Sequence, residues 1–165
     1  MDAAAIHARL RERFGEAIEG VDLEAKDPFV VVRAEAIAEV CRYLRDDPDL
    51  RFDCLSNLTG VDLKAENLLQ VVYHLYSYPH RHSIVLKVTT PRENPRVPTV
   101  ERVWKAANWL EREAYDLLGI VFEGHSDLRR ILMPEDWVGH PLRKDFVEPE
   151  EYHGISTRRE SLLRS

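Results

Sequence analysis

The 165-residue sequence has few of the residues that build cofactor and disulfide sites. Its two cysteines, Cys41 and Cys54, fall short of the roughly four closely spaced ligands that an iron–sulfur cluster or a structural zinc site needs. Cys41 belongs to an apolar helical pattern, so we expect a buried, reduced thiol there. The seven glycines form no phosphate-binding loop or dinucleotide fingerprint, and a Gly-x-Ser-x-Gly nucleophile motif is missing.

Long hydrophobic runs and an excess of basic residues are also missing. No run approaches the ~20 apolar residues that a membrane-spanning helix needs, and residues 1–18, MDAAAIHARLRERFGEAI, are not typical of a signal peptide. The net charge is −6, from 23 basic and 29 acidic residues, which disfavours binding to nucleic acid or directly to anionic lipid. We expect a soluble, cytoplasmic protein that reaches a membrane only through partners.

Apolar spacing predicts three helices. The first covers Ile6 to Phe14 and ends at Gly15, and the second covers residues 34–47 and stops before Pro48. The third is the longest: we expect Thr99 to be its N-cap, Glu101 to favour the positive end of the helix dipole, and Gly119 to be its C-cap. Its expected inward face consists of Val103, Ala107, Leu110, Ala114 and Leu117.

Strands are predicted for residues 28–33, 52–63, 68–78 and 83–90, and the connector 79–82 makes the last two a hairpin. The element order indicates a two-layer α+β domain over residues 1–120, in which helices pack on a mainly antiparallel sheet. Periodicity fades in residues 121–165, which predicts an extended irregular C-terminal tail that docks on a partner. Only residues 156–165 indicate another helical turn.

Residues 111–132, EREAYDLLGIVFEGHSDLRRIL, gather several ionisable side chains. Glu113 and Asp116 are three residues apart, so we expect them to be neighbours on the helix surface. Two such carboxylates could form an acid–base pair or share a metal. With His125 and His140, they could be the site of a metal-dependent hydrolase.

Basic residues favour a structural interpretation of the same stretch. Arg112, Arg129 and Arg130 are close enough in sequence to neutralise the carboxylates, Glu111 included. We therefore expect ion pairs with arginines to fix the helix end and the loop that follows it.

The histidines do not form an obvious ligand set. His74, His80 and His82 cluster at the predicted hairpin without a fourth partner nearby, so we expect them to face solvent. His125 and His140 each follow a glycine, which could mark a loop fixed by an imidazole hydrogen bond to the backbone.

The tail combines large apolar side chains, arginines and prolines, as interface hot spots do. Pro134, Pro141 and Pro149 stiffen it, which lowers the entropy lost on docking. We interpret it as a strap that becomes ordered on another surface, in an adaptor or in a larger complex. Alternatively, it wraps its own domain. The anchors are Ile131, Leu132, Met133, Trp137, Leu142, Phe146 and Tyr152, interleaved with Arg129, Arg130, Arg143 and Lys144.

Residues 111–132 and their continuation, 133-MPEDWVGHPLRKDF-146, resemble the signature of the 30 kDa-type subunit, or C subunit, of respiratory complex I. The stretch 58-LTGVD-62 resembles a strand of the same family. Ser126, Val138 and Phe146 depart from the common pattern, in which proline, an acidic residue and tyrosine are frequent. The signature positions are Glu111, Arg112, Glu113, Asp116, His125, Arg129, Arg130, Trp137, His140, Arg143, Lys144 and Asp145.

The resemblance implies a non-catalytic structural subunit of the peripheral arm, on the cytoplasmic side of the cell membrane. Its partners would be the large quinone-site subunit, which it helps to assemble and hold, and neighbouring iron–sulfur subunits. The chain would bind no cofactor, whereas the parent complex uses FMN, iron–sulfur clusters, NADH and quinone to couple electron transfer to proton translocation. A related membrane-bound hydrogenase-type complex is the alternative parent. The signature residues are expected to have structural or interface roles.

Overall fold

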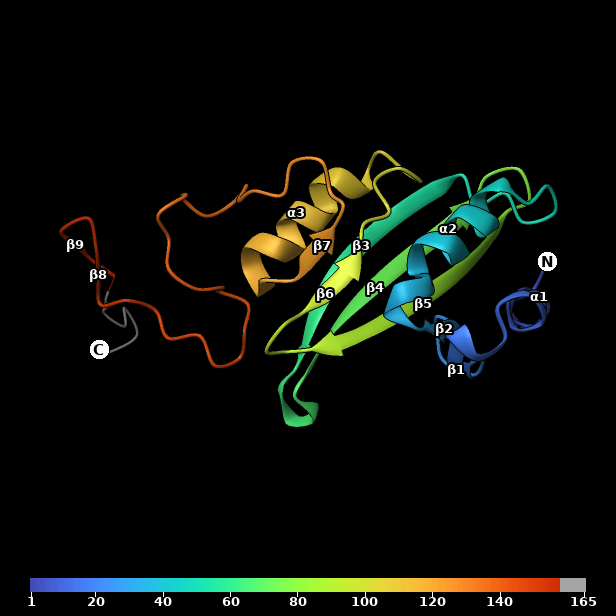
Figure 1. Ribbon diagram of the computed structural model, residues 1–165, viewed down its shortest axis with the longest axis horizontal. Helices are drawn as coiled ribbons and strands as arrows, with labels where there is room; N and C mark the ends of the chain where they lie inside the picture. The colour runs from blue at the N-terminus through green and yellow to red at the C-terminus, as the bar shows by residue number, and fades with distance from the viewer. Residues whose placement is uncertain (158–165) are drawn as a thin grey trace, which may run out of the picture.

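A computed structural model describes residues 1–157 as an α+β fold (Figure 1). Five strands form one sheet in the order β1-β2-β5-β4-β3. Neighbouring strands are antiparallel except β2 and β5, so the predicted mainly antiparallel sheet is confirmed. The strands are β1 (Ile18–Asp22), β2 (Phe29–Val32), β3 (Cys54–Leu63), β4 (Leu68–Ser77) and β5 (His82–Pro91).

Helices α1 (Ala3–Phe14), α2 (Ile37–Asp46) and α3 (Ala107–Leu118) supply the second layer. Figure 1 shows α2 and α3 in front of the sheet, with α1 near the edge formed by β1 and β2. Alternation along a strand sends every second side chain into the core. On β4 these are Leu69, Val71, Tyr73 and Leu75, which are buried with the apolar faces of the helices.

Helix α2 follows its apolar pattern closely. Ile37, Val40, Cys41 and Leu44 are all fully buried, because their spacing puts them on one side of the helix. Cys41 is a buried free thiol, as expected, and Cys54 is also unbridged. Short 3₁₀ turns at Gly15–Ala17, Ala34–Ala36 and Lys64–Glu66 connect the regular elements.

The predicted start of α3 at Thr99 is wrong, because the helix begins at Ala107. The strand β6 (Arg96–Pro98) pairs with β7 (Val121–Glu123), and the N–H of Thr99 extends this pairing by donating to the carbonyl of Glu123. Residues 100–106 then form turns, and the indole N–H of Trp104 donates to the carbonyl of Phe52 at 2.9 Å. These contacts with distant segments outweigh local helix propensity.

Short strands of two to five residues were missed. These are β1, β6, β7 and the two-residue strands β8 (Glu151–Tyr152) and β9 (Ile155–Ser156). Since β7 is paired with β6, the regular structure extends a few residues beyond the predicted boundary at residue 120. Of the helical turn expected at 156–165, Ser156 is in a strand and residues 158–165 lie outside the described part of the chain.

The expectation that His82 faces solvent is also wrong. Its ring is buried, Nε2 lies 2.8 Å from the carbonyl of Leu50, and the ring packs on Phe52. His80 is exposed, as expected, and His74 is half-buried.

Residues 124–150 contain no helix or strand, and Figure 1 shows them as a long loop that passes α3 and continues away from the sheet to β8 and β9. The predicted irregular tail is therefore present over this range. None of the helices in residues 1–157 has the length and apolar character needed to cross a bilayer.

Candidate functional site

Asp116 lies at the centre of the contacts between α3 and the tail. Its side chain is fully buried, and Oδ2 accepts hydrogen bonds from the amides of Ile131, Leu132 and Met133 at 3.0, 2.7 and 2.8 Å. Oδ1 lies 2.7 Å from Nη1 of Arg130. Burial alone raises the pKa of Asp116, but the hydrogen bonds outweigh it and hold the pKa below its ordinary value.

Arg130 connects this carboxylate to two further points of the tail. Its guanidinium also donates to the carbonyl of Asp116 at 3.2 Å and to those of Trp137 and Gly139, each at 3.0 Å. Because guanidinium donors are fixed in a plane, this one side chain sets the positions of three chain segments relative to one another.

The tail also supplies donors to the last turn of α3, whose carbonyls lack partners within the helix. The carbonyl oxygens of residues 116, 117 and 118 accept from Nδ1 of His140 at 2.9 Å, the N–H of Leu142 at 3.0 Å and Nε of Arg143 at 2.7 Å. Gly119 ends the helix in the left-handed conformation, as predicted, and the ring of His140 lies against it. Nδ1 of His140 donates, and burial lowers the pKa of this histidine.

The contacts around Asp116 form one clamp between the tail and α3. A second clamp, centred on Asp62, joins the tail to the sheet. Asp62, at the end of β3, accepts two hydrogen bonds from Arg92 at 2.8 and 2.9 Å and one from the N–H of Lys144 at 2.8 Å. Arg92 also reaches Asp145 at 2.7 Å. The block 143–145 is thereby held at both α3 and β3, so this part of the tail wraps its own domain.

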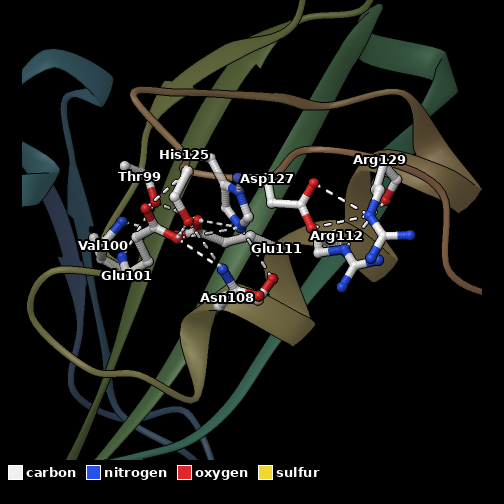
Figure 2. A network of polar contacts seen from close by, with 10 residues as sticks. Thr99, Val100, Glu101, Asn108, Glu111, Arg112, His125, Asp127 and Arg129 are labelled. Carbon is white, nitrogen blue, oxygen red and sulfur yellow. Dashed lines mark hydrogen bonds and ion pairs between the residues drawn. The ribbon is translucent and has the colours of Figure 1, made fainter.

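Glu111 occupies a third site, drawn in Figure 2. It is fully buried and accepts from the hydroxyl of Thr99 and, at 2.7 Å, from the N–H of Val100. Burial raises the pKa of Glu111 to about 7, although these two hydrogen bonds oppose the shift. None of the arginines in residues 1–157 pairs with Glu111, which instead fixes the turns that precede α3.

His125 lies beside Glu111 and Glu101, and its side chain is fully buried (Figure 2). The N–H of Asp127 donates to Nδ1 at 3.0 Å, so Nε2 carries the hydrogen and donates to the carbonyl of Asn108 at 3.1 Å. The predicted imidazole–backbone hydrogen bond is therefore confirmed for His125, as it is for His140. Both rings act as connectors between α3 and the following loop.

Arg112 is buried without a carboxylate partner among the described residues. It donates to the carbonyls of Arg129 and Arg130 at 3.3 and 3.5 Å, and its guanidinium lies 4.9 Å from the ring of Trp109. Arg129 is exposed and pairs with Asp127 at 2.9 Å. Of the expected ion pairs between the helix carboxylates and arginines, the one between Asp116 and Arg130 is confirmed.

The structure separates the residues of the hydrolase hypothesis. Glu113 is exposed, whereas Asp116 is buried and fully used by Arg130 and three amides, so the expectation that the two are neighbours on the surface is wrong. His125 and His140 are both turned toward backbone groups. Within residues 1–157, no three histidine, cysteine or carboxylate side chains are placed to hold a metal. Within the described residues, Glu113, Asp116, His125 and His140 are therefore not gathered into the site that the hydrolase hypothesis needs.

Trp137 is half-buried and packs against Phe146 and Tyr152, with ring centroids 6.4 and 5.2 Å apart.

Among the residues that sequence reasoning missed, Asp62 and Arg92 are the most important. Asp62 stands in the LTGVD stretch that carried part of the resemblance, which was the available signal. No local sequence pattern predicts the role of Arg92, because its partners are 30 and 53 residues away.

Comparisons with known proteins agree on one family. Residues 30–152 match the model described as respiratory-chain NADH dehydrogenase, 30 Kd subunit. The NADH-quinone oxidoreductase C subunit of Roseiflexus sp. (strain RS-1) is 51% identical over 146 residues, which cover 88% of this chain and 84% of that protein. The C subunit of the same enzyme from Chlorobium phaeobacteroides is 43% identical over 155 residues, or 93% of each chain.

Solved structures show the same likeness. A trypsin-resistant fragment (1-134) of Nqo5 is 33% identical, with a TM-score of 0.60 over 74% of this chain and 98% of that one. A chain of the membrane-bound sulfane sulfur reductase, an archaeal respiratory membrane complex, is 25% identical, with a TM-score of 0.73 over 87% and 85%. Together with the match over residues 30–152, these findings show that the chain belongs to the family of the 30 kDa subunit of respiratory-chain NADH dehydrogenase, the C subunit of NADH-quinone oxidoreductase.

Proposed function

We propose that this chain is a non-catalytic structural subunit of a complex I-type NADH:quinone oxidoreductase. In this proposal it lies in the peripheral arm, on the cytoplasmic side of the membrane, and helps to assemble and hold the large quinone-site subunit. FMN, the iron–sulfur clusters, NADH and quinone would be bound by other subunits. Family membership supports the assignment to the complex, and the tail supports the structural role.

The observation that carries the structural role is the exposure of large apolar side chains along the tail. Val138 and Val147 are 83% and 84% exposed, and Ile155 is 71% exposed. Apolar groups exposed on one segment cost free energy in water and gain it when a partner covers them. A tail of this kind is suited to docking on another protein.

The clamps at Asp116 and Asp62 support the same role. They fix residues 130–145 on the domain, so docking would have to order less of the chain and would lose less entropy. Exposed apolar side chains on both sides of residue 145 are left for the partner: Val138 before it, and Val147 and Ile155 after it.

The likeness to the sulfane sulfur reductase chain leaves a different respiratory complex as a second parent to consider. The relatives named as C subunits of NADH-quinone oxidoreductase include one about twice as similar in sequence, at 51% against 25% identity. The NADH:quinone oxidoreductase is therefore the parent that we propose.

The test is affinity purification of the tagged chain from mildly solubilised membranes. Val138→Asp combined with Val147→Asp should reduce recovery of the large quinone-site subunit by roughly tenfold or more, which corresponds to about 1.4 kcal/mol of binding. Val21→Asp, which changes an exposed valine on β1, is the matched control. Equal recovery with the tail variant and the control would show that the tail does not hold this partner.

A further inference from the structure

A shallow groove with a volume of about 20 Å³ lies between α3 and β3, at the edge of the sheet. Its lining includes Thr59 and Gly60 from β3, Leu110, Glu113 and Leu117 from α3, and Leu142 from the tail. Gly60 forms part of the floor: a Cβ added there would lie 2.3 Å from Cδ1 of Leu118. The side chain of Leu118 on α3 therefore packs directly on the backbone of the strand.

Of the described residues that line this groove, only Glu113 carries a charge. Its side chain is exposed and makes no hydrogen bond or ion pair with residues 1–157. The other two carboxylates of α3, Glu111 and Asp116, are buried and hydrogen-bonded elsewhere. A single carboxylate among aliphatic side chains suits a lysine or arginine, because the stem of such a residue packs on apolar surface while its charged end pairs.

Other apolar residues lie near Glu113, along the helix and in the groove. Trp109 and Leu117 lie one helical turn before and after it, and Trp109 is 65% exposed. Leu142, from the tail, is 58% exposed and also lines the groove.

The outer edge of β3 is free over the same stretch. β3 is the last strand of the five-stranded sheet, so none of the described strands pairs with that edge. A bulge between Leu55 and Asn57 interrupts the strand before the groove, and Lys144 contacts Asp62 beyond it. Residues 57–61 remain, with backbone groups that an added extended segment can pair with.

We propose that this groove binds an extended segment of a second protein of the complex, in which a lysine or arginine stands between aliphatic residues. The basic group pairs with Glu113, the aliphatic side chains pack on Leu110, Leu117 and Leu142, and the backbone runs along residues 57–61 of β3. The inference rests on the proposed membership of a multi-subunit complex. It adds a contact surface that does not include Val138, Val147 or Ile155.

Photocrosslinking in the assembled complex tests this inference. p-Benzoyl-phenylalanine replaces Thr59 at the groove or, in a separate variant, Val147 in the tail, and mass spectrometry identifies the linked peptides. From position 59 we expect one partner peptide with a lysine or arginine flanked by aliphatic residues. Adding Glu113→Arg should reduce that crosslink at least tenfold, whereas Glu12→Arg, at an exposed helical glutamate on α1, should leave it unchanged.

The outcomes separate this inference from the proposed function. A crosslink from position 147 with none from position 59 would keep the docking tail and overturn the groove. A position 59 crosslink to a peptide without a basic residue, or one that Glu113→Arg does not reduce, would also overturn it. Crosslinks from neither position would contradict the proposed function itself. Thermal unfolding of the Glu113→Arg chain, expected to match the wild type because residue 113 is exposed, shows that a lost crosslink is not a loss of folding.

Discussion

Oδ1 of Asp116 lies 2.7 Å from Nη1 of Arg130, and this buried ion pair joins the last turn of α3 to the beginning of the tail. The other carboxylate oxygen accepts three consecutive amides, so both oxygens are used. The stretch that looked most like an active site is therefore a junction between helix and tail. Several outcomes depend on this junction and on the buried groups beside it.

Asp116→Asn should destabilise the isolated chain. The neutral amide cannot form an ion pair with Arg130, and its NH2 group would face either the guanidinium or the three backbone amides. Removing one partner of a buried ion pair costs about 3–5 kcal/mol. Urea unfolding at pH 7 measures the change. Glu113→Gln, on the same helix but exposed, is the control and should stay within about 0.5 kcal/mol of the wild type. Equal stabilities of the two variants would show that the junction contributes little.

Gly119→Ala should be costly for two reasons. The residue has φ +77°, and an added Cβ would lie 2.6 Å from Nε2 of His140, where overpacking typically costs about 1–3 kcal/mol. Gly124→Ala has a similar φ of +82° but a nearest contact of only 3.6 Å, so it reports the backbone strain alone. We expect the Gly119 variant to unfold at lower urea than the Gly124 variant. The reverse order would mean that His140 does not press on the helix end.

Glu111 should make stability depend on pH in the opposite sense to an ordinary carboxylate. Burial raises its pKa from 4.5 to about 7, so the folded chain holds a proton that the unfolded chain releases. The contribution of Glu111 to the free energy of unfolding is complete below pH 4.5 and falls by about 3 kcal/mol as the pH rises through 7. In Glu111→Gln this loss is removed, and the stability of the variant relative to the wild type should therefore increase between pH 5 and pH 8.

Glu101→Gln controls for this effect within the same network. Burial opposes ionisation of Glu101, but hydrogen bonds from Asn108 and Ser126 outweigh it and lower its pKa. Its contribution is therefore constant above the ordinary value of 4.5. Urea unfolding at pH 5, 6, 7 and 8 gives the free energy of unfolding as a function of pH. The slope of this dependence should differ from that of the wild type for Glu111→Gln only. A slope identical to that of the wild type would mean that Glu111 is already ionised when folded.

Tyr73→Phe should leave stability unchanged or raise it by up to about 1 kcal/mol. The hydroxyl is fully buried and has no hydrogen-bond partner among the described residues, so its desolvation is uncompensated. Leu75→Ala, on the same buried face of β4, provides the contrast and should cost about 2–5 kcal/mol. A loss of more than about 1 kcal/mol in Tyr73→Phe would indicate that the hydroxyl is bonded in solution.

Local patterns predicted the parts of the fold that local contacts determine. The four buried positions of α2 and the β4–β5 hairpin follow directly from periodicity and a short connector. The Gly-His pairs at His125 and His140 correctly indicated imidazole–backbone hydrogen bonds. The start of α3 did not follow, because Thr99 pairs with Glu123 across β6 and β7.

Burial of charge could not be predicted in the same way. The i, i+3 spacing of Glu113 and Asp116 suggested a shared exposed face, yet loop 131–133 covers only Asp116. Glu111 is buried because the turns at Thr99 and Val100 fold over it. Partners more than ten residues away decide both cases, and hydrophobic periodicity carries no information about them.

The most direct test of the proposed role is the composition of the complex in cells that lack this chain. We predict that membranes from such cells lose the large quinone-site subunit from the complex, together with NADH:quinone oxidoreductase activity. The wild-type chain should restore both, whereas Asp116→Asn should restore less. Full assembly and activity in the absence of the chain would contradict the proposal that it holds the large quinone-site subunit in place.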